Sequence, residues 1–113
     1  MLKIANTRAL ILYTINCLEE EKCPASNGRL MEICAEIQRQ GVFVYTPPES
    51  PLSEYFRDYV KNDLHDCLGN YWVKEKEEAL SITKSGKDYL RGAGLGLEIE
   101  EIIGGIINSK YKK

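Results

Sequence analysis

The chain has 113 residues, of which 43% are hydrophobic and 28% are charged, and its formal net charge is −2. This length predicts one domain that can bury a core without disulfides or a bound metal. The slightly negative charge excludes a bulk electrostatic attraction to nucleic acid. No apolar run approaches the roughly 20 residues that a membrane-spanning helix needs, so we expect no membrane partner.

The N-terminal part of the chain predicts two amphipathic helices, over residues 7–20 and 28–40. In both, apolar residues recur at helical spacing, and Gly41 marks the end of the second helix. The apolar stretch of the first helix imitates a weak secretion signal, but no small-x-small cleavage site follows it. We therefore expect a core helix and a cytoplasmic protein.

The middle of the chain predicts a short strand and a long helix. A β-prone run at residues 42–45 is followed by a proline-rich segment that cannot form regular structure. Ser50 is suited to cap the third helix, with Pro51 in its first turn, and Gly69–Asn70 is expected to end it.

Two further strands are expected at residues 71–73 and 79–82. The charged segment 74–78 joins them into a hairpin and contains neither glycine nor asparagine. Two-residue hairpin turns favour these residues, so the sequence predicts a longer loop.

The most specific motif runs from Leu80 to Arg91. Leu80 and Ile82 alternate with more polar residues, which is typical of a half-buried strand. Thr83 is suited to cap the next helix, and Gly86 in its first turn leaves room for another element. This pattern resembles the junction between the wing and the following helix in winged helix-turn-helix proteins, including PadR-like and MarR-like regulators.

The resemblance covers roughly residues 8–91 and implies an α+β, mostly α fold. This fold is a winged helix-turn-helix with a small β-hairpin wing and an added C-terminal helix. A weaker similarity, carried by residues 29–33 and 51–54, links the chain to uncharacterised bacterial and archaeal winged-helix proteins. We expect a winged-helix domain over residues 1–92, followed by a hinge and a dimerisation helix over residues 93–113.

In this family the third helix enters the major groove of DNA, and the wing contacts the backbone or the minor groove. The resemblance therefore implies contacts with duplex DNA from the third helix, the wing and the start of the fourth helix. The matching side chains are Ser53, Arg57, Lys61 and Asn62, then Lys74 and Lys76, then Lys84, Lys87 and Arg91.

The acidic residues of the third helix oppose this interpretation. Residues 52–68 carry two positive and four negative charges, and carboxylates beside phosphate weaken binding. Alternatively, Arg57 and Lys61 form ion pairs within their helix, with Glu54 and Asp58.

The last expected helix, residues 97–108, carries an isoleucine stripe that is too apolar for a solvated tail. Two arrangements stay open: the helix folds back on its own core, or it forms a two-fold dimer that places two winged helices on one duplex. The dimerisation residues would be Leu97, Ile99, Ile102, Ile103, Ile106 and Ile107.

The function that we expect is a small homodimeric transcription regulator that binds duplex DNA without a cofactor. The alternative is a winged-helix module whose acidic third helix and proline-rich loop bind a protein. We do not expect an enzyme, because the chain has one histidine and no nucleophile–base pair can be argued from spacing. We expect no metal site, because the four cysteines match no zinc-binding pattern.

Overall fold

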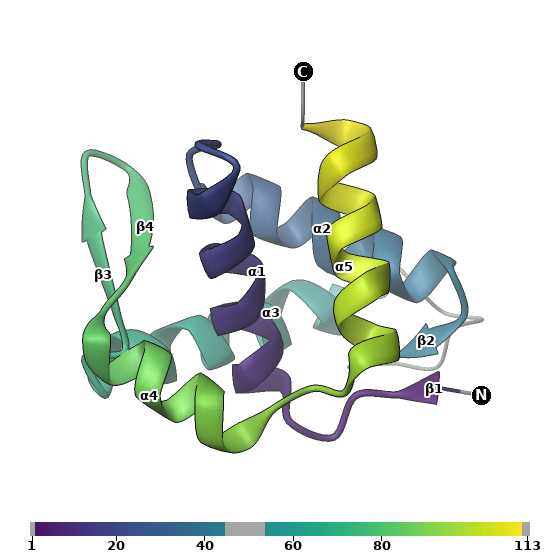
Figure 1. Cartoon of the computed structure of the whole chain (residues 1–113), viewed down its shortest axis with the longest axis horizontal. Helices are drawn as coiled ribbons and strands as arrows, with labels where there is room; N and C mark the ends of the chain where they lie inside the picture. Colours follow the sequence, from purple (N-terminus) through teal and green to yellow (C-terminus); the bar gives the residue numbers. More distant parts are fainter. Residues whose placement is uncertain (1, 45–53, 112–113) are drawn as a thin grey trace.

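Five helices and two small sheets make up the described part of the computed structural model, which comprises residues 2–44 and 54–111 (Figure 1). The mostly helical α+β class expected from the sequence is confirmed. In chain order the elements are β1 (Leu2–Lys3), α1 (Thr7–Glu20), α2 (Asn27–Arg39), β2 (Val42–Phe43), α3 (Glu54–Gly69), β3 (Val73–Lys76), β4 (Ala79–Ile82), α4 (Lys84–Ala93) and α5 (Leu97–Lys110).

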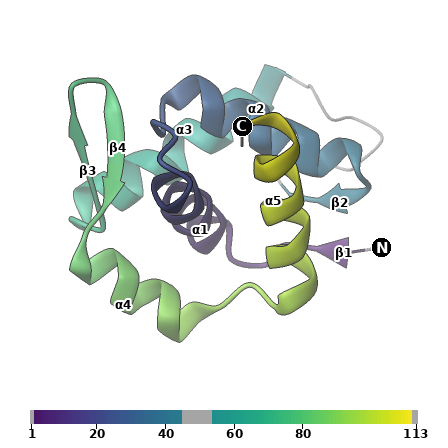
Figure 2. The ribbon, with the colours of Figure 1, turned by 45° about the horizontal axis from the view of Figure 1, so that its top comes forward.

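Helix α1 lies at the centre of the molecule, and the other helices surround it (Figure 2). It begins where the Asn6 side chain accepts a hydrogen bond from the Ala9 backbone N–H at 3.0 Å, as an N-cap does. The buried surface of α1 is wider than a single apolar stripe at helical spacing, since Leu12 is also fully buried. A helix that is apolar on most sides is one that packs inside a core.

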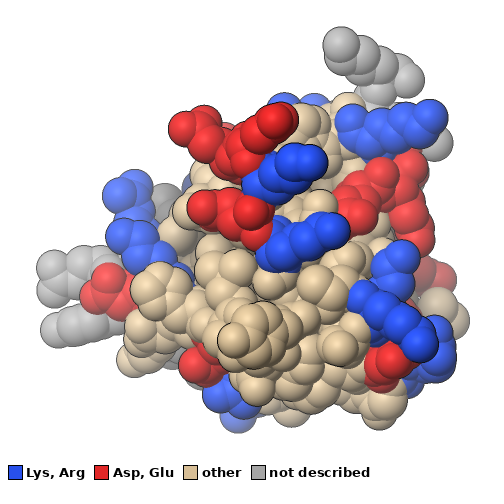
Figure 3. Space-filling view, turned by 90° about the vertical axis from the view of Figure 1, so that its left-hand side faces the viewer, with Lys and Arg blue, Asp and Glu red and all other residues tan. Residues whose placement is uncertain are grey.

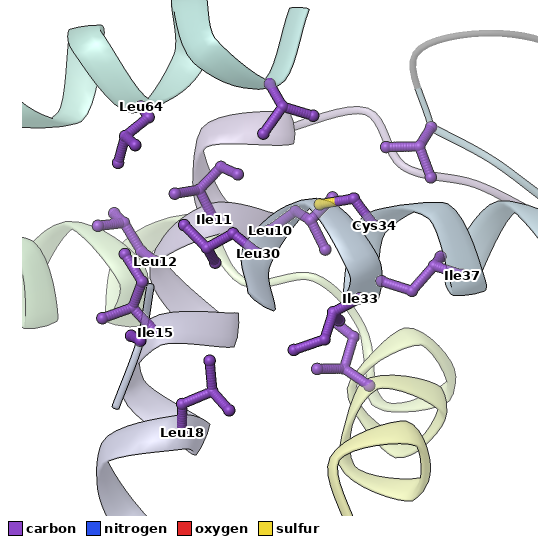
Figure 4. Packing of buried hydrophobic residues seen from close by; sticks show 14 of the residues in the cluster. Leu10, Ile11, Leu12, Ile15, Leu18, Leu30, Ile33, Cys34, Ile37 and Leu64 are labelled. Atoms are coloured by element: carbon purple, nitrogen blue, oxygen red, sulfur yellow. The ribbon is translucent and has the colours of Figure 1, made fainter. Parts of the chain in front are cut away.

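One hydrophobic core joins α1 to the rest of the chain (Figure 4). The apolar face of α2, including Ile33 and Cys34, packs beside α1, and Leu64 of α3 closes the core from another side. The N-terminal strand β1, which the sequence did not indicate, pairs in parallel with β2.

The isoleucine stripe of α5 also belongs to this core. Ile99, Ile103, Ile106 and Ile107 are at most 5% exposed, and α5 contacts α1 and α2. The helix is therefore folded back on its own chain. The expectation that these four residues line a dimer interface is corrected, because the core of one chain already covers them. Of the other two residues in the expected seam, Ile102 is partly buried and Leu97 is exposed.

The hairpin of β3 and β4 is held against the helices through the outer edge of β4. The Leu80 N–H donates to the Ala25 carbonyl at 2.9 Å. Ala25 lies in the loop between α1 and α2, and it forms an antiparallel β-bridge with Leu80 of β4. The Ile82 N–H donates to Oε1 of Glu19, on α1, at 2.6 Å. These two bonds satisfy edge groups that would otherwise face solvent.

The turn of this hairpin differs from the expectation. β3 extends to Lys76, which pairs with Ala79, so that only Glu77 and Glu78 lie between the strands. Both glutamates have positive φ, 53° and 65°, as a type I′ turn requires. The prediction of a longer loop was wrong because strand pairing imposes a two-residue turn that the turn residues themselves disfavour.

We expect the double change Glu77→Asn and Glu78→Gly to raise the free energy of unfolding by about 1 kcal/mol, because both new residues adopt positive φ readily. Chemical denaturation would measure the gain. The control, Glu77→Gln with Glu78→Gln, removes the same two charges but keeps the disfavoured backbone. A gain of equal size in the control would assign the effect to charge instead of conformation.

Candidate nucleic-acid interface

Helix α3 presents three of the four DNA-binding side chains that were expected on the third helix. Phe56, Val60, Leu64 and Cys67 recur at helical spacing and bury one face of α3 in the core. The other face is therefore open to solvent. Arg57, Lys61 and Asn62 are exposed there, whereas Ser53 lies outside the described residues.

The acidic residues of α3 are partly separated from its cations. Asp66 pairs with Arg8 of α1, whose Nη2 lies 2.8 Å from Oδ2 of Asp66. This hydrogen bond raises the pKa of the Arg8 guanidinium, and the charge of Asp63 acts in the same direction. One of the carboxylates that weigh against DNA binding is therefore paired with a cation of α1. Asp58 is exposed.

Arg57 and Lys61 stand one helical turn apart, and neither forms an ion pair with any side chain in the described ranges. The expected alternative, an ion pair between Lys61 and Asp58, is absent among these residues. The side chain of Glu54 lies outside the described residues.

Both cations line a groove between Asn27–Arg39 of α2 and Phe56–His65 of α3, here called the α2–α3 groove. It consists of two adjoining hollows of about 770 and 390 Å³. The two hollows share the lining residues Asn27, Met31 and Lys61. Two further cations, Arg39 and Lys110, line the larger hollow.

The wing lysines Lys74 and Lys76 are exposed on β3. Because side chains alternate along a strand, both lysines point to one side of the hairpin and Glu75 to the other. Figure 3, which faces the hairpin, shows positive and negative side chains interleaved above a broad neutral surface.

The basic residues of α4 do not join the α3 cations. Lys84 and Lys87 are exposed, and Nη1 of Arg91 lies 3.6 Å from Oδ1 of Asp88. Lys87 and Arg91 line a separate hollow of about 360 Å³ beside Tyr13 of α1. Since α3 and α4 lie on opposite sides of α1, the expected residues form two cationic surfaces instead of one (Figure 2).

The start of α4 has the geometry expected from its motif. The Thr83 hydroxyl accepts a hydrogen bond from the Gly86 N–H at 3.1 Å and donates to the Tyr71 carbonyl at 2.6 Å. Gly86 lies so close to the Trp72 backbone that a Cβ built on it would be 2.2 Å from the Trp72 carbonyl oxygen. This junction fixes the base of the hairpin against α4.

Sequence reasoning missed the contribution of α2 and α5 to the groove. Neither Arg39 nor Lys110 is among the DNA-binding residues expected from the sequence, yet both line the groove. No pattern in the sequence reports that these residues approach α3. The groove depends on how far apart α2 and α3 pack on α1.

Two of the four cysteines are buried in the core. Burial raises the pKa of the Cys34 and Cys67 thiols to about 12, so both stay protonated at neutral pH. In the described ranges, no group of three or more His, Cys, Asp and Glu side chains is placed to hold a metal ion. The helices described here also include none that is long and apolar enough to cross a bilayer.

Comparisons of the chain with protein-family models, with curated proteins and with solved structures give no match.

Proposed function

We propose that the chain binds duplex DNA through the exposed face of α3 and the lysines of the hairpin. The separation of charge on α3 carries this proposal. Arg57 and Lys61 lie exposed along the α2–α3 groove, whereas Asp66 is paired with Arg8. The acidic composition of the helix therefore understates the positive charge that this groove offers to phosphate.

The order of the elements supports a winged helix-turn-helix as the fold that delivers this surface. Helix α1 is followed by the bridging residue Ala25, then by α2, α3 and the hairpin. In such a fold the third helix reads the major groove, and Arg57 and Asn62 have the side chains for bidentate pairing with guanine and adenine. The connection is long, since α2 ends at Arg39 and α3 begins at Glu54.

The role that such binding would serve is that of a small transcription regulator. A second copy on the same DNA would have to contact the first through surfaces other than the buried isoleucines. Of the expected seam, Leu97 at the start of α5 is exposed and Ile102 is only partly buried, so these two residues are still open to such a contact.

The test compares retention of random-sequence duplex DNA at about 50 and 200 mM salt. Removing both α3 cations, by Arg57→Gln with Lys61→Gln, is expected to reduce the slope of log K against log salt by about 2, because each lost phosphate contact removes nearly one counterion. The matched control, Lys87→Gln with Arg91→Gln, removes the same charge on the far side of α1 and should leave the slope unchanged.

Each departure from this result has a definite meaning. An equal loss in both double variants would show bulk electrostatic attraction, and a loss in the control alone would move the interface to α4. No retention of the unaltered chain at about 50 mM salt would overturn the proposal. A protein partner would then be favoured, and Tyr71, which is 79% exposed, offers an aromatic contact for it.

A further inference from the structure

We infer that the outer edge of β3 binds an acidic segment of another protein as an added β-strand. This edge is the side of Val73–Lys76 that faces away from β4. Three features point to such a partner: open backbone groups along the edge, lysines that repel a second copy of this chain, and an alternation of charge beside the open groups.

The direction of the backbone groups of β3 follows from the bonds of β4. The Leu80 and Ile82 N–H groups point away from β3, because they donate to the α1–α2 loop and to α1. In an antiparallel pair, residues opposite each other turn their N–H and C=O groups either both inward or both outward. Leu80 lies opposite Glu75, and Ile82 lies opposite Val73. Val73 and Glu75 therefore point their N–H and C=O groups away from β4.

These groups of β3 are open, unlike those of β4. No described residue pairs with the outward N–H and C=O groups of Val73 and Glu75. β3 lies on the outer side of the hairpin, farther from α1 than β4 is (Figure 1). An open edge of this kind is a ready template for a further strand. It offers two N–H donors and two C=O acceptors to the backbone of a partner.

A second copy of this chain is a poor partner for the edge. Two β3 strands that pair antiparallel through their open groups set Val73 opposite Glu75, or Glu75 opposite Glu75. The first register places Lys74 opposite Lys74, and the second places Lys74 opposite Lys76. Like charges directly opposite each other destabilise a sheet, and lysine on an edge strand is a common protection against self-pairing.

The charges of β3 favour an acidic strand instead. Lys74 and Lys76 are exposed on one face of the hairpin, and neither forms an ion pair among the described residues. Residues opposite each other on neighbouring strands point to the same face, where pairs of opposite charge are stabilising. The added strand would therefore carry Asp or Glu at every second position, opposite the two lysines.

This inference does not rest on the proposed function, and only one consequence joins the two. DNA and the acidic strand would both contact Lys74 and Lys76, so a bound strand is expected to weaken the retention of DNA. The contacts with DNA need the lysine side chains alone, whereas the added strand also needs the backbone of Val73 and Glu75.

Titration with two synthetic peptides, followed by NMR, tests the inference. The probes are Thr-Glu-Thr-Glu-Thr-Glu-Thr and Thr-Lys-Thr-Lys-Thr-Lys-Thr, both blocked at their ends. The acidic peptide is expected to bind at least about tenfold more tightly. It should slow hydrogen exchange at the Val73 and Glu75 amides and leave the Lys74 and Lys76 amides, which already face β4, nearly unchanged.

A proline variant separates backbone pairing from charge. Glu75→Pro removes an outward N–H at a position where an edge strand accepts proline, and it is expected to weaken binding of the acidic peptide by about tenfold or more. The matched control, Glu75→Gln, removes the same charge but keeps the N–H, so it should bind the acidic peptide at least as tightly as the unaltered chain. Lys74→Glu with Lys76→Glu leaves the backbone intact and should reverse the preference between the peptides. Unfolding curves would verify that each variant folds.

Several outcomes would overturn the inference. These are equal binding of the two peptides, binding that leaves the Val73 and Glu75 amides unprotected, and no binding of the acidic peptide up to ~1 mM. Protection of the same two amides by self-association, without any peptide, would assign the edge to a second copy and would also overturn it. Failure of the unaltered chain to retain DNA would overturn the proposed function alone, because the peptide titration contains no DNA.

Discussion

Replacing Gly86 with alanine is expected to lower the free energy of unfolding by about 3 kcal/mol. In most helices this change is stabilising, because alanine is the better helix former. Here the new Cβ would be 2.2 Å from the Trp72 carbonyl oxygen and 2.8 Å from Cγ1 of Ile82. The Trp72 carbonyl cannot simply move away, since it accepts the Thr83 N–H at 2.9 Å.

The same substitution in α5 provides the control. A Cβ at Gly105 would meet no atom within 4 Å, so Gly105→Ala should raise the free energy of unfolding by about 0.8–1 kcal/mol. Chemical denaturation of the two variants should thus give changes of opposite sign. A gain in stability for Gly86→Ala would show that the hairpin base is not packed as closely as described.

Truncating Ile103 to alanine is expected to destabilise the protein by about 2–5 kcal/mol, because the side chain is fully buried and its loss leaves a cavity. The melting temperature of the unaltered chain should not depend on protein concentration, because α5 completes the core of its own chain. Thermal unfolding over a wide concentration range measures both quantities.

Leu97 belongs to the same expected seam and serves as the control, since it is 73% exposed. Leu97→Ala should change stability by no more than about 0.5 kcal/mol. A melting temperature that rises with concentration, together with a large effect of Leu97→Ala, would instead show that α5 is stabilised by a second copy.

The sequence was sufficient for features set by local periodicity and capping. The bounds expected for the first helix agree with α1, Thr7–Glu20, because its apolar spacing is continuous from end to end. The Thr83 cap and the close approach at Gly86 were also predicted, since both follow from residue types with one dominant structural use. These features need no knowledge of distant contacts.

α3 ends at Gly69, as expected, but the left-handed residue that follows it is not the one that local preference favours. Gly69 and Asn70 suit the left-handed residue that ends many helices, yet Tyr71 adopts that conformation, with φ 60°. The Tyr71 N–H donates to Leu68 and the Trp72 N–H to Cys67, which is the pattern of a Schellman cap. Because Cys67 is buried in the core, α3 continues to Gly69, and the left-handed conformation falls on Tyr71 although glycine or asparagine would adopt it more readily.

The candidate site could be predicted only in part. The winged-helix resemblance placed Arg57 and Lys61 on the third helix and Lys74 and Lys76 on the wing, and all four side chains are exposed there. Their separation from Lys87 and Arg91 could not be predicted, because it depends on α3 and α4 packing on opposite sides of α1. The pairing of Asp66 with Arg8 joins residues 58 positions apart, which no local pattern reports.

The contacts that close the molecule over α1 have a consequence for how it folds. Asn6 donates to the Tyr89 hydroxyl, 83 positions away, and Tyr111 donates to Glu32 across 79 positions. Both contacts close long loops, whose entropy must be lost before the contacts contribute any stability. The chain thus combines the local contacts of five helices with contacts that join its two ends, and we expect it to fold more slowly than a helical bundle that lacks such contacts.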